Sequence, residues 1–328
     1  MSADVPATDD PVVAALREAC EGEVTGAAPI SELTTLKVGG PARVHVDAMR
    51  DDDLVAVGRV CAEHDLPWLI VGRGSNLLVA DAGWHGIAVS LGRGFRGYEV
   101  DGELVTAGAA EPLPSLAVKL ANEGFRGFAW AAAVPGSLGG GVRMNAGAHG
   151  GEMADHLVEA ELFRLSSGSR ETWPAANLGL RYRHSDLPSD AVVVAATLRL
   201  ARGETEEVRA EISEIKQWRR DHQPINEPNC GSVFTNPEGD SAGRLIEAVG
   251  GKELRIGGAG VSALHANFIV TTPTATAADV RSLIRTLRQR VADESGIVLR
   301  PEVQMVGDFD DEGLEVRAPD GAADGRGG

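Results

Sequence analysis

The stretch VPGSLGGGVRMNAGAHGG, residues 134–151, is the most informative segment of this chain of 328 residues. It contains seven glycines, and glycine loses more backbone entropy on folding than any other residue, so a packed domain needs a reason to concentrate it. We expect Val134, Leu138, Val142 and Met144 to be buried, which argues against a loose surface loop. The segment therefore predicts a place where a flat or charged ligand lies directly against the main chain.

A second glycine-rich turn, VGRGSNL at residues 71–77, follows the apolar run at residues 68–70. A strand that leads into Gly-x-Gly-Ser-Asn can point several backbone N–H groups at one anion. The turn is not the dinucleotide motif G-x-G-x-x-G, because Leu77 stands at the third glycine position, and it is not a P-loop. Taken alone, this turn fits a tight bend that binds nothing as well as it fits an anion site. Together the two segments predict a large ligand held mainly by backbone groups.

Composition narrows the class of protein. Hydrophobic residues make up 43% of the chain, as in ordinary globular proteins. The net charge of -17 argues against nucleic acid and against an anionic membrane surface as partners. An anionic small molecule needs local cations, and the candidates are Arg181, Arg183, Arg219, Arg220, Lys252 and Arg255. The three cysteines lack metal-ligand spacing, and neither a secretory signal nor a bilayer-length apolar run is visible, so we expect a cytoplasmic protein.

Helix and strand signals interleave along the chain. Apolar spacing predicts helices from residue 51 and over 114–123, 204–220 and 277–294. The last is the clearest, because Thr276 and Asp279 resemble a capping box at its start. Strands are expected over 68–71, 86–90, 157–165, 191–200 and 301–306, with a hairpin over 98–106. Residues 1–10 and 308–328 are polar and acidic, and we expect them to be disordered.

Three side chains are candidates for chemistry, and each has an ordinary alternative. Ser232 follows a glycine and precedes an apolar stretch, yet such serines are more often turn or cap residues. Arg183 suits bidentate capture of a carboxylate or phosphate, but a surface ion pair is the commoner role. Glu302 follows Pro301 at a strand start, where most carboxylates are simply solvated. No Gly-x-Ser-x-Gly motif supports a hydrolase, and the histidines lack metal-ligand spacing.

Taken in order, these motifs resemble the MurB family of flavin-dependent reductases of bacterial cell-wall synthesis. The resemblance runs from about residue 33 to residue 307. It rests on the joint order of TTLKVGGPA at 34–42, the two glycine-rich segments, YRHS at 182–185, CGSVF at 230–234, the segment 261–269, and PEV at 301–303. No added loop with a substrate-capping tyrosine is visible, so the chain is similar to the compact, type II-like subgroup.

The resemblance implies an α+β fold with two parts. One is a two-subdomain FAD-binding module of the vanillyl-alcohol-oxidase (PCMH/VAO) type, and the other is a C-terminal α+β substrate-binding domain. The implied division is a tail with the start of the first helix at 1–20, FAD subdomains at 21–92 and 93–203, the substrate-binding domain at 204–307, and an acidic tail at 308–328.

The resemblance also implies an activity. Non-covalently bound FAD takes reducing equivalents from NADPH and reduces UDP-N-acetylglucosamine enolpyruvate to UDP-N-acetylmuramate. By motif position, Arg183 and Glu302 bind and polarise the enolpyruvyl carboxylate, and Ser232 delivers a proton. Tyr182 and Asn236 are assigned to the substrate. The residues assigned to FAD are Gly72, Arg73, Gly74, Ser75, Asn76, Leu77, Pro135, Gly136, Ser137, Gly139, Gly140, Asn145, Ala146 and Gly147. No metal is implied, and we expect a monomer.

Two other functions share some of these features. A flavin oxidase or dehydrogenase acting on another small acid would keep the glycine-rich segments but lack the joint set of Arg183, Ser232 and Glu302. In a flavin carrier without enzymatic activity, Ser232 and Glu302 would be incidental. Arg143, His222 and Arg300 depart from the family pattern. Glu302 facing a carboxylate would have its pKa raised by like charge, and the sequence leaves its protonation open.

Overall fold

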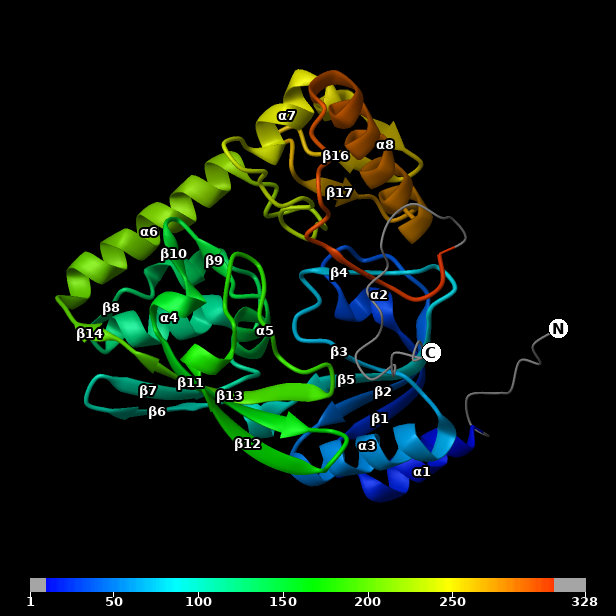
Figure 1. Ribbon diagram of the computed structural model, residues 1–328, viewed down its shortest axis with the longest axis vertical. Coiled ribbons are helices and arrows are strands. Elements are labelled where there is room, and N and C mark those ends of the chain that lie inside the picture. Colours follow the sequence, from blue (N-terminus) through cyan, green and yellow to red (C-terminus); the bar gives the residue numbers. More distant parts are fainter. Residues whose placement is uncertain (1–9, 310–328) are drawn as a thin grey trace.

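The computed structural model describes residues 10–309, which form a mixed α and β fold (Figure 1). The first part is a four-stranded sheet of order β1-β2-β5-β3, in which β5 runs parallel to both of its neighbours. Its strands are β1 (Glu23–Pro29), β2 (Pro41–Ala48), β3 (Trp68–Ile70) and β5 (Trp84–Leu91). Helices α1 (Pro11–Ala19) and α3 (Asp51–His64) bury their apolar faces against this sheet. The helix expected from residue 51 is confirmed.

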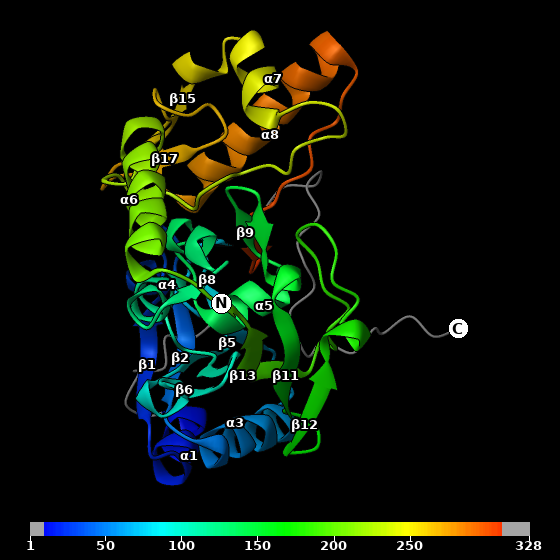
Figure 2. The ribbon, with the colours of Figure 1, turned by 90° about the vertical axis from the view of Figure 1, so that its left-hand side faces the viewer.

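The second part is an antiparallel sheet of order β12-β11-β13-β7-β6. Its strands are β6 (Tyr98–Asp101), β7 (Leu104–Gly108), β11 (Leu157–Arg164), β12 (Ser169–Pro174) and β13 (Ala191–Arg199). One face packs on α4 (Leu113–Asn122), and the other packs toward α3, so β13 is buried along almost its whole length. Helix α6 (Thr205–His222) crosses this part and leads upward out of it (Figure 1). The long α6 stands upright beside β9 and α4 in the turned view (Figure 2).

The third part contains the short sheet β15-β16-β17 and two helices, α7 (Ala242–Ala248) and α8 (Ala277–Ser295). Helix α8 confirms the clearest helix prediction, including the Thr276–Asp279 capping box and a fully buried apolar stripe. The sheet strands are β15 (Arg255–Ile256), β16 (Ala259–Val261) and β17 (Ile269–Thr271). After α8 the chain returns to the first part, where β18 (Gln304–Val306) pairs in parallel with β4 (Leu77–Val79).

The glycine run after residue 137 contains a helix that the sequence did not predict. Residues 138–143 form helix α5 (Leu138–Arg143), whose first turn is capped by the Ser137 hydroxyl, which accepts from the Gly140 N–H at 3.4 Å. The small residues serve packing here, because a Cβ at Gly139 would lie 2.9 Å from the Ala109 Cβ. Leu138 and Val142 are buried as expected, whereas Val134 and Met144 are half-buried.

Short elements complete the described residues, namely α2 (Ile30–Leu33), β8 (Phe125–Arg126), β9 (Gly147–Ala148), β10 (Gly151–Glu152), β14 (Ala201–Arg202) and the 3₁₀ turns Arg93–Phe95, Ala129–Ala133, Met153–Asp155, Ala175–Asn177 and Gly251–Glu253. Within residues 10–309 no helix has the length and apolar character needed to cross a bilayer. The segments expected to be disordered, residues 1–10 and 308–328, fall outside the described residues except for Asp10, Asp308 and Phe309. Asp10 is ordered, because its carboxylate caps α1 by accepting the Val12 N–H at 2.9 Å.

Candidate active site

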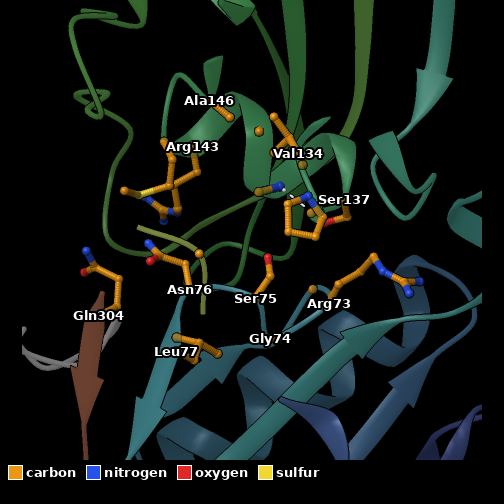
Figure 3. Close-up of a pocket in the computed structure, with 18 of the residues that line it drawn as sticks. Arg73, Gly74, Ser75, Asn76, Leu77, Val134, Ser137, Arg143, Ala146 and Gln304 are labelled. Carbon is orange, nitrogen blue, oxygen red and sulfur yellow. Dashed lines mark hydrogen bonds between the residues drawn. The ribbon is translucent and has the colours of Figure 1, made fainter. Parts of the chain in front are cut away.

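A cavity of about 510 Å³ lies where the three parts meet, and both glycine-rich segments line it. Figure 3 shows Ser75 and Asn76 on one side facing Val134, Ser137 and Ala146 on the other. All residues that the sequence assigned to FAD line this cavity except Asn145. The volume is in the range of small-molecule and cofactor sites.

The turn at residues 72–76 presents unused backbone donors to the cavity. None of its N–H groups donates a hydrogen bond to another described residue. The two glycine-rich segments also approach each other closely, since a Cβ at Gly72 would lie 2.7 Å from the Ser137 hydroxyl oxygen. Convergent free N–H groups in a tight turn form an anion-binding concavity.

The cavity is lined by more cations than anions, although the whole chain carries a net charge of -17. The charged lining residues are Arg73, Arg96, Arg143, Arg183 and Arg219, with Asp47 and Glu302. Of the six cations proposed from sequence, Arg183 and Arg219 line the cavity. The other four bond elsewhere: Arg181 to Asp186, Arg220 to Gln217, Lys252 to Glu247, and Arg255 to backbone carbonyls. The lining therefore favours an anionic ligand.

Arg183 and Glu302 form an ion pair across 119 positions of sequence. The Arg183 Nε donates to Glu302 Oε1 at 2.8 Å, and its Nη2 donates to the Gly147 carbonyl oxygen at 2.8 Å. Arg183 has a positive φ of 55°, uncommon for a residue other than glycine, so the loop is constrained to present this side chain. Burial raises the pKa of the Glu302 carboxyl, while the Arg183 guanidinium acts in the opposite direction.

Ser232 lies in a rigid segment beside Glu302. Gly231 has a φ of +74° and donates its N–H to Asn229 Oδ1 at 2.9 Å, which closes a tight turn. The next carbonyl, at Val233, accepts the Glu302 N–H at 2.7 Å. Ser232 lines the cavity, and its hydroxyl bonds to no other described residue. The apolar stretch after Ser232 forms no strand, and Phe234 makes an isolated bridge to Pro301.

The buried side chain of Asn267 holds this segment in place. Its Oδ1 accepts from the Phe234 N–H at 3.0 Å, and its Nδ2 donates to the Phe234 carbonyl at 2.8 Å. The Asn267 amide thus makes the two backbone hydrogen bonds that a neighbouring strand would make in a sheet. Sequence reasoning did not single out Asn267, although it lies within the motif at 261–269.

Asn76 ties the first glycine-rich segment to the C-terminal segment. Its Nδ2 donates to the Glu302 carbonyl at 3.1 Å, and its own carbonyl accepts the Gln304 N–H at 2.9 Å. These bonds extend the pairing of β4 with β18 and bring Glu302 to the cavity. Arg183, Ser232 and Glu302, predicted from three separate motifs, therefore line the same cavity.

Comparison with known proteins agrees with this geometry. Two family models match, an FAD binding domain over residues 42–172 and the C-terminal domain of UDP-N-acetylenolpyruvoylglucosamine reductase over residues 223–306. The UDP-N-acetylenolpyruvoylglucosamine reductase of Bacillus velezensis is 38% identical over 298 residues, which cover 90% of this chain and 98% of the relative. The chain belongs to the UDP-N-acetylenolpyruvoylglucosamine reductase, or MurB, family.

Other MurB relatives agree. The reductase of Lachnoclostridium phytofermentans is 41% identical over 290 residues, which cover 87% of this chain and 93% of that relative. The crystal structure of the reductase from Thermus caldophilus matches with a TM-score of 0.75 and 35% identity, covering 87% of this chain and 98% of that one. The matched FAD binding domain spans both glycine-rich segments, so FAD is the cofactor. The predicted family and α+β fold class are confirmed.

Three residues assigned by the MurB resemblance do not line the cavity. Asn145 is fully buried, and its amide bonds the Arg181 carbonyl and the Ala154 N–H. Asn236 Oδ1 accepts the Ala242 N–H at 3.0 Å and so caps α7. Tyr182 is 52% exposed and lies with its ring 5.0 Å from the Arg183 guanidinium carbon.

Two of the three departures from the MurB pattern, Arg143 and His222, have side-chain partners. Arg143 donates to the carbonyls of Pro188 and Ala191 from the cavity wall, and the ring of His222 stacks on Trp218. The Arg300 carbonyl accepts the Thr235 N–H at 3.0 Å. Sequence reasoning missed Arg96, Asp47 and Gln304, which also line the cavity and belong to no motif that it recognised.

Proposed function

We propose that this chain catalyses the NADPH-dependent reduction of UDP-N-acetylglucosamine enolpyruvate to UDP-N-acetylmuramate, a step in peptidoglycan precursor synthesis. The observation that carries the proposal is that Arg183, Ser232 and Glu302 line one cavity together with both glycine-rich segments. Family membership supports the reaction, and the geometry supports the role that we propose for each side chain.

The cavity suits FAD. The free N–H groups of residues 72–76 fit its pyrophosphate, and Gly136 and Gly140, which line the cavity without a side chain, let a ligand approach the main chain. When bound, FAD supplies a redox carrier that takes a hydride from NADPH and passes it to the methylene carbon of the enolpyruvyl group. The residues proposed to hold FAD by side chain or main chain are those at 72–77, 135–137, 139–140 and 146–147. Asn145 is proposed to stabilise this segment through its bonds to the Arg181 carbonyl and the Ala154 N–H.

Arg183 is proposed to bind the substrate carboxylate. Its guanidinium uses one N–H on Glu302 and one on the Gly147 carbonyl, which leaves the rest of its five donors for a ligand. Negative charge grows on the carboxylate as the hydride arrives, so a fixed cation there stabilises the transition state more than the ground state. Tyr182 covers the outer side of this guanidinium, and Asn236 acts on the substrate only indirectly, through the start of α7.

Glu302 is proposed to act in its protonated form. Burial raises the pKa of this carboxyl, and a substrate carboxylate placed nearby would raise it further through like charge. A protonated Glu302 donates a hydrogen bond to the substrate where an ionised one would repel it.

Ser232 is proposed to give the proton that completes the reduction at the carbon beside the carboxylate. Ser232 lines the cavity, its hydroxyl has no competing partner among the described residues, and its backbone is fixed by the Asn229 turn and the Asn267 clasp. A positioned acid of this kind contributes about 10²–10⁴-fold to rate. The position next to Glu302 lets both groups act on one end of the substrate.

We also propose that residues 21–92 and 93–203 form the FAD module and 204–307 the substrate domain, and that the protein acts as a cytoplasmic monomer without nucleic-acid or membrane partners. Strand β18, although it lies within the substrate domain in sequence, then packs with the first FAD subdomain, because it pairs with β4.

The Ser232→Ala variant tests the function. Reduction of bound FAD by NADPH should stay within about twofold of the natural chain, whereas reoxidation by the enolpyruvyl sugar should slow by about 10²–10⁴-fold. Rapid-mixing absorbance measures the two half-reactions separately. Equal slowing of both would remove Ser232 as donor. Reduction of bound FAD by another small acid, without reoxidation by the enolpyruvyl sugar, would identify an oxidase or dehydrogenase instead.

A further inference from the structure

Three aromatic rings lie beside the cavity without lining it. The Trp218 indole, 41% exposed near the end of α6, stacks on the His222 ring one turn later at 4.6 Å and 13°. His222 Nδ1 lies 2.8 Å from the Trp218 carbonyl, which fixes that ring. The His149 ring meets the indole edge-to-face at 5.0 Å and 90°. We call His149, Trp218 and His222 the ring stack.

His149 belongs to the turn of the β9–β10 hairpin, which lies alongside α6 (Figures 1 and 2). Each strand has two residues, and the turn has φ values of +49° at His149 and +84° at Gly150. A hairpin this short does not hold its own position. On its inner side Gly151 packs so tightly against the Trp130 ring that a side chain would clash. On its outer side the His149–Trp218 contact holds the turn.

The hairpin also carries a partner of the proposed carboxylate-binding arginine. The Gly147 carbonyl, in β9, accepts from Arg183 Nη2 at 2.8 Å, and both residues line the cavity. A continuous path therefore runs from Trp218 through His149 and Gly147 to Arg183. Trp218 does not itself line the cavity, whereas its neighbour Arg219 does, so the indole acts from the rim.

We propose that the ring stack is a positioning device for Arg183. It pins the turn of the β9–β10 hairpin to α6, so that the Gly147 carbonyl holds the guanidinium at the angle needed for the substrate carboxylate. Trp218 and His149 are thus positioning residues and touch neither cofactor nor substrate. This inference rests on the proposed function and adds to it a pair of residues that set the efficiency of the second half-reaction.

Three variants test the contact itself. Trp218→Leu removes the ring, Trp218→Phe keeps one, and His149→Asn removes the other ring while keeping a residue that tolerates positive φ. An aromatic pair of this strength corresponds to about a threefold to tenfold effect. We expect Trp218→Leu and His149→Asn to slow reoxidation of reduced FAD by the enolpyruvyl sugar by that factor. Reduction by NADPH should stay within about twofold, and Trp218→Phe should restore most of the rate.

An Arg183→Lys background tests whether the stack acts through Arg183. A lysine cannot bond Glu302 and Gly147 in the same fork, so Trp218→Leu should slow reoxidation no further in that background. Val55→Ala is the matched control, because Val55 is also 41% exposed on a helix but lies on α3. It should leave both half-reactions unchanged.

The outcomes separate this inference from the function it rests on. A natural chain that is not reoxidised by the enolpyruvyl sugar refutes the proposed function. If the enolpyruvyl sugar reoxidises FAD in the natural chain, and reoxidises it equally fast in Trp218→Leu and His149→Asn, only the positioning role is refuted. Equal slowing of both half-reactions, or an undiminished effect in the Arg183→Lys background, also overturns that role, because it shows a general structural effect.

Discussion

Replacing Asn267 by alanine should destabilise the protein by about 3 kcal/mol. The Asn267 amide bonds both the N–H and the carbonyl of Phe234, and both residues are buried. Each buried backbone group left without a partner costs about 1–3 kcal/mol, which gives about 2–6 kcal/mol for the pair. The smaller alanine side chain leaves space for water to satisfy part of this loss, so the expected value lies in the lower half of that range.

Urea unfolding of the FAD-free protein, followed by fluorescence, measures this change. Asn122→Ala serves as the control, because the exposed side chain of Asn122 bonds, among the described residues, to Arg209 at the surface, and such a change stays within about 0.5 kcal/mol. Activity should fall as well, since Phe234 is close in sequence to Ser232. A loss below about 1 kcal/mol with normal turnover would show that the Asn267 clasp does not hold the Ser232 segment.

An aspartate at the same position sharpens the test. In Asn267→Asp, one carboxyl oxygen can accept the Phe234 N–H, but the other must carry a proton to donate to the Phe234 carbonyl. The folded pKa of this carboxyl is then raised above its unfolded value of about 3.9. Its stabilisation is full below the unfolded pKa and is lost as pH rises through the folded pKa. The stability gap to the natural chain should therefore narrow on acidification, and a widening gap would contradict the clasp.

Three further predictions concern the site and its surroundings. Because burial raises the folded pKa of Glu302, its stabilisation is lost as pH rises through that pKa. Unfolding should therefore show Glu302→Gln gaining stability relative to the natural chain as pH rises from the unfolded value of about 4.3 through the raised folded pKa. Arg183→Lys should slow reoxidation by the enolpyruvyl sugar about 10²-fold or more, and near-normal rates would remove Arg183 from the site. Burial raises the pKa of Cys61 and Cys230 to about 12, so mass spectrometry should find both unmodified by iodoacetamide at about pH 8 until the protein unfolds.

The elements that the sequence predicted well have strong local signals. Helix α8 combines a regular apolar stripe with a capping box, and α3 begins at a run of aspartates. Strand β12 was missed because it lies at a sheet edge, is half exposed and is polar. Helix α5 was missed because glycine disfavours helices, and only packing on Ala109 and Met153 explains why small residues stand there.

The site could be predicted in part. The resemblance named Arg183, Ser232 and Glu302, but their meeting depends on the three-residue pairing of β4 with β18, whose local signal is weak. Asn145 and Asn236 show a different limit. In a sequence, an asparagine that lines a cavity looks the same as one whose amide bonds the backbone. Only tertiary contacts distinguish the two roles.

The absorbance spectrum of the FAD-loaded protein without oxygen tests the central claim most directly. NADPH should bleach the flavin band, and UDP-N-acetylglucosamine enolpyruvate should then restore it while UDP-N-acetylmuramate appears in equal amount. A protein that takes up no flavin, or whose reduced flavin stays bleached when this sugar is added, would contradict the account.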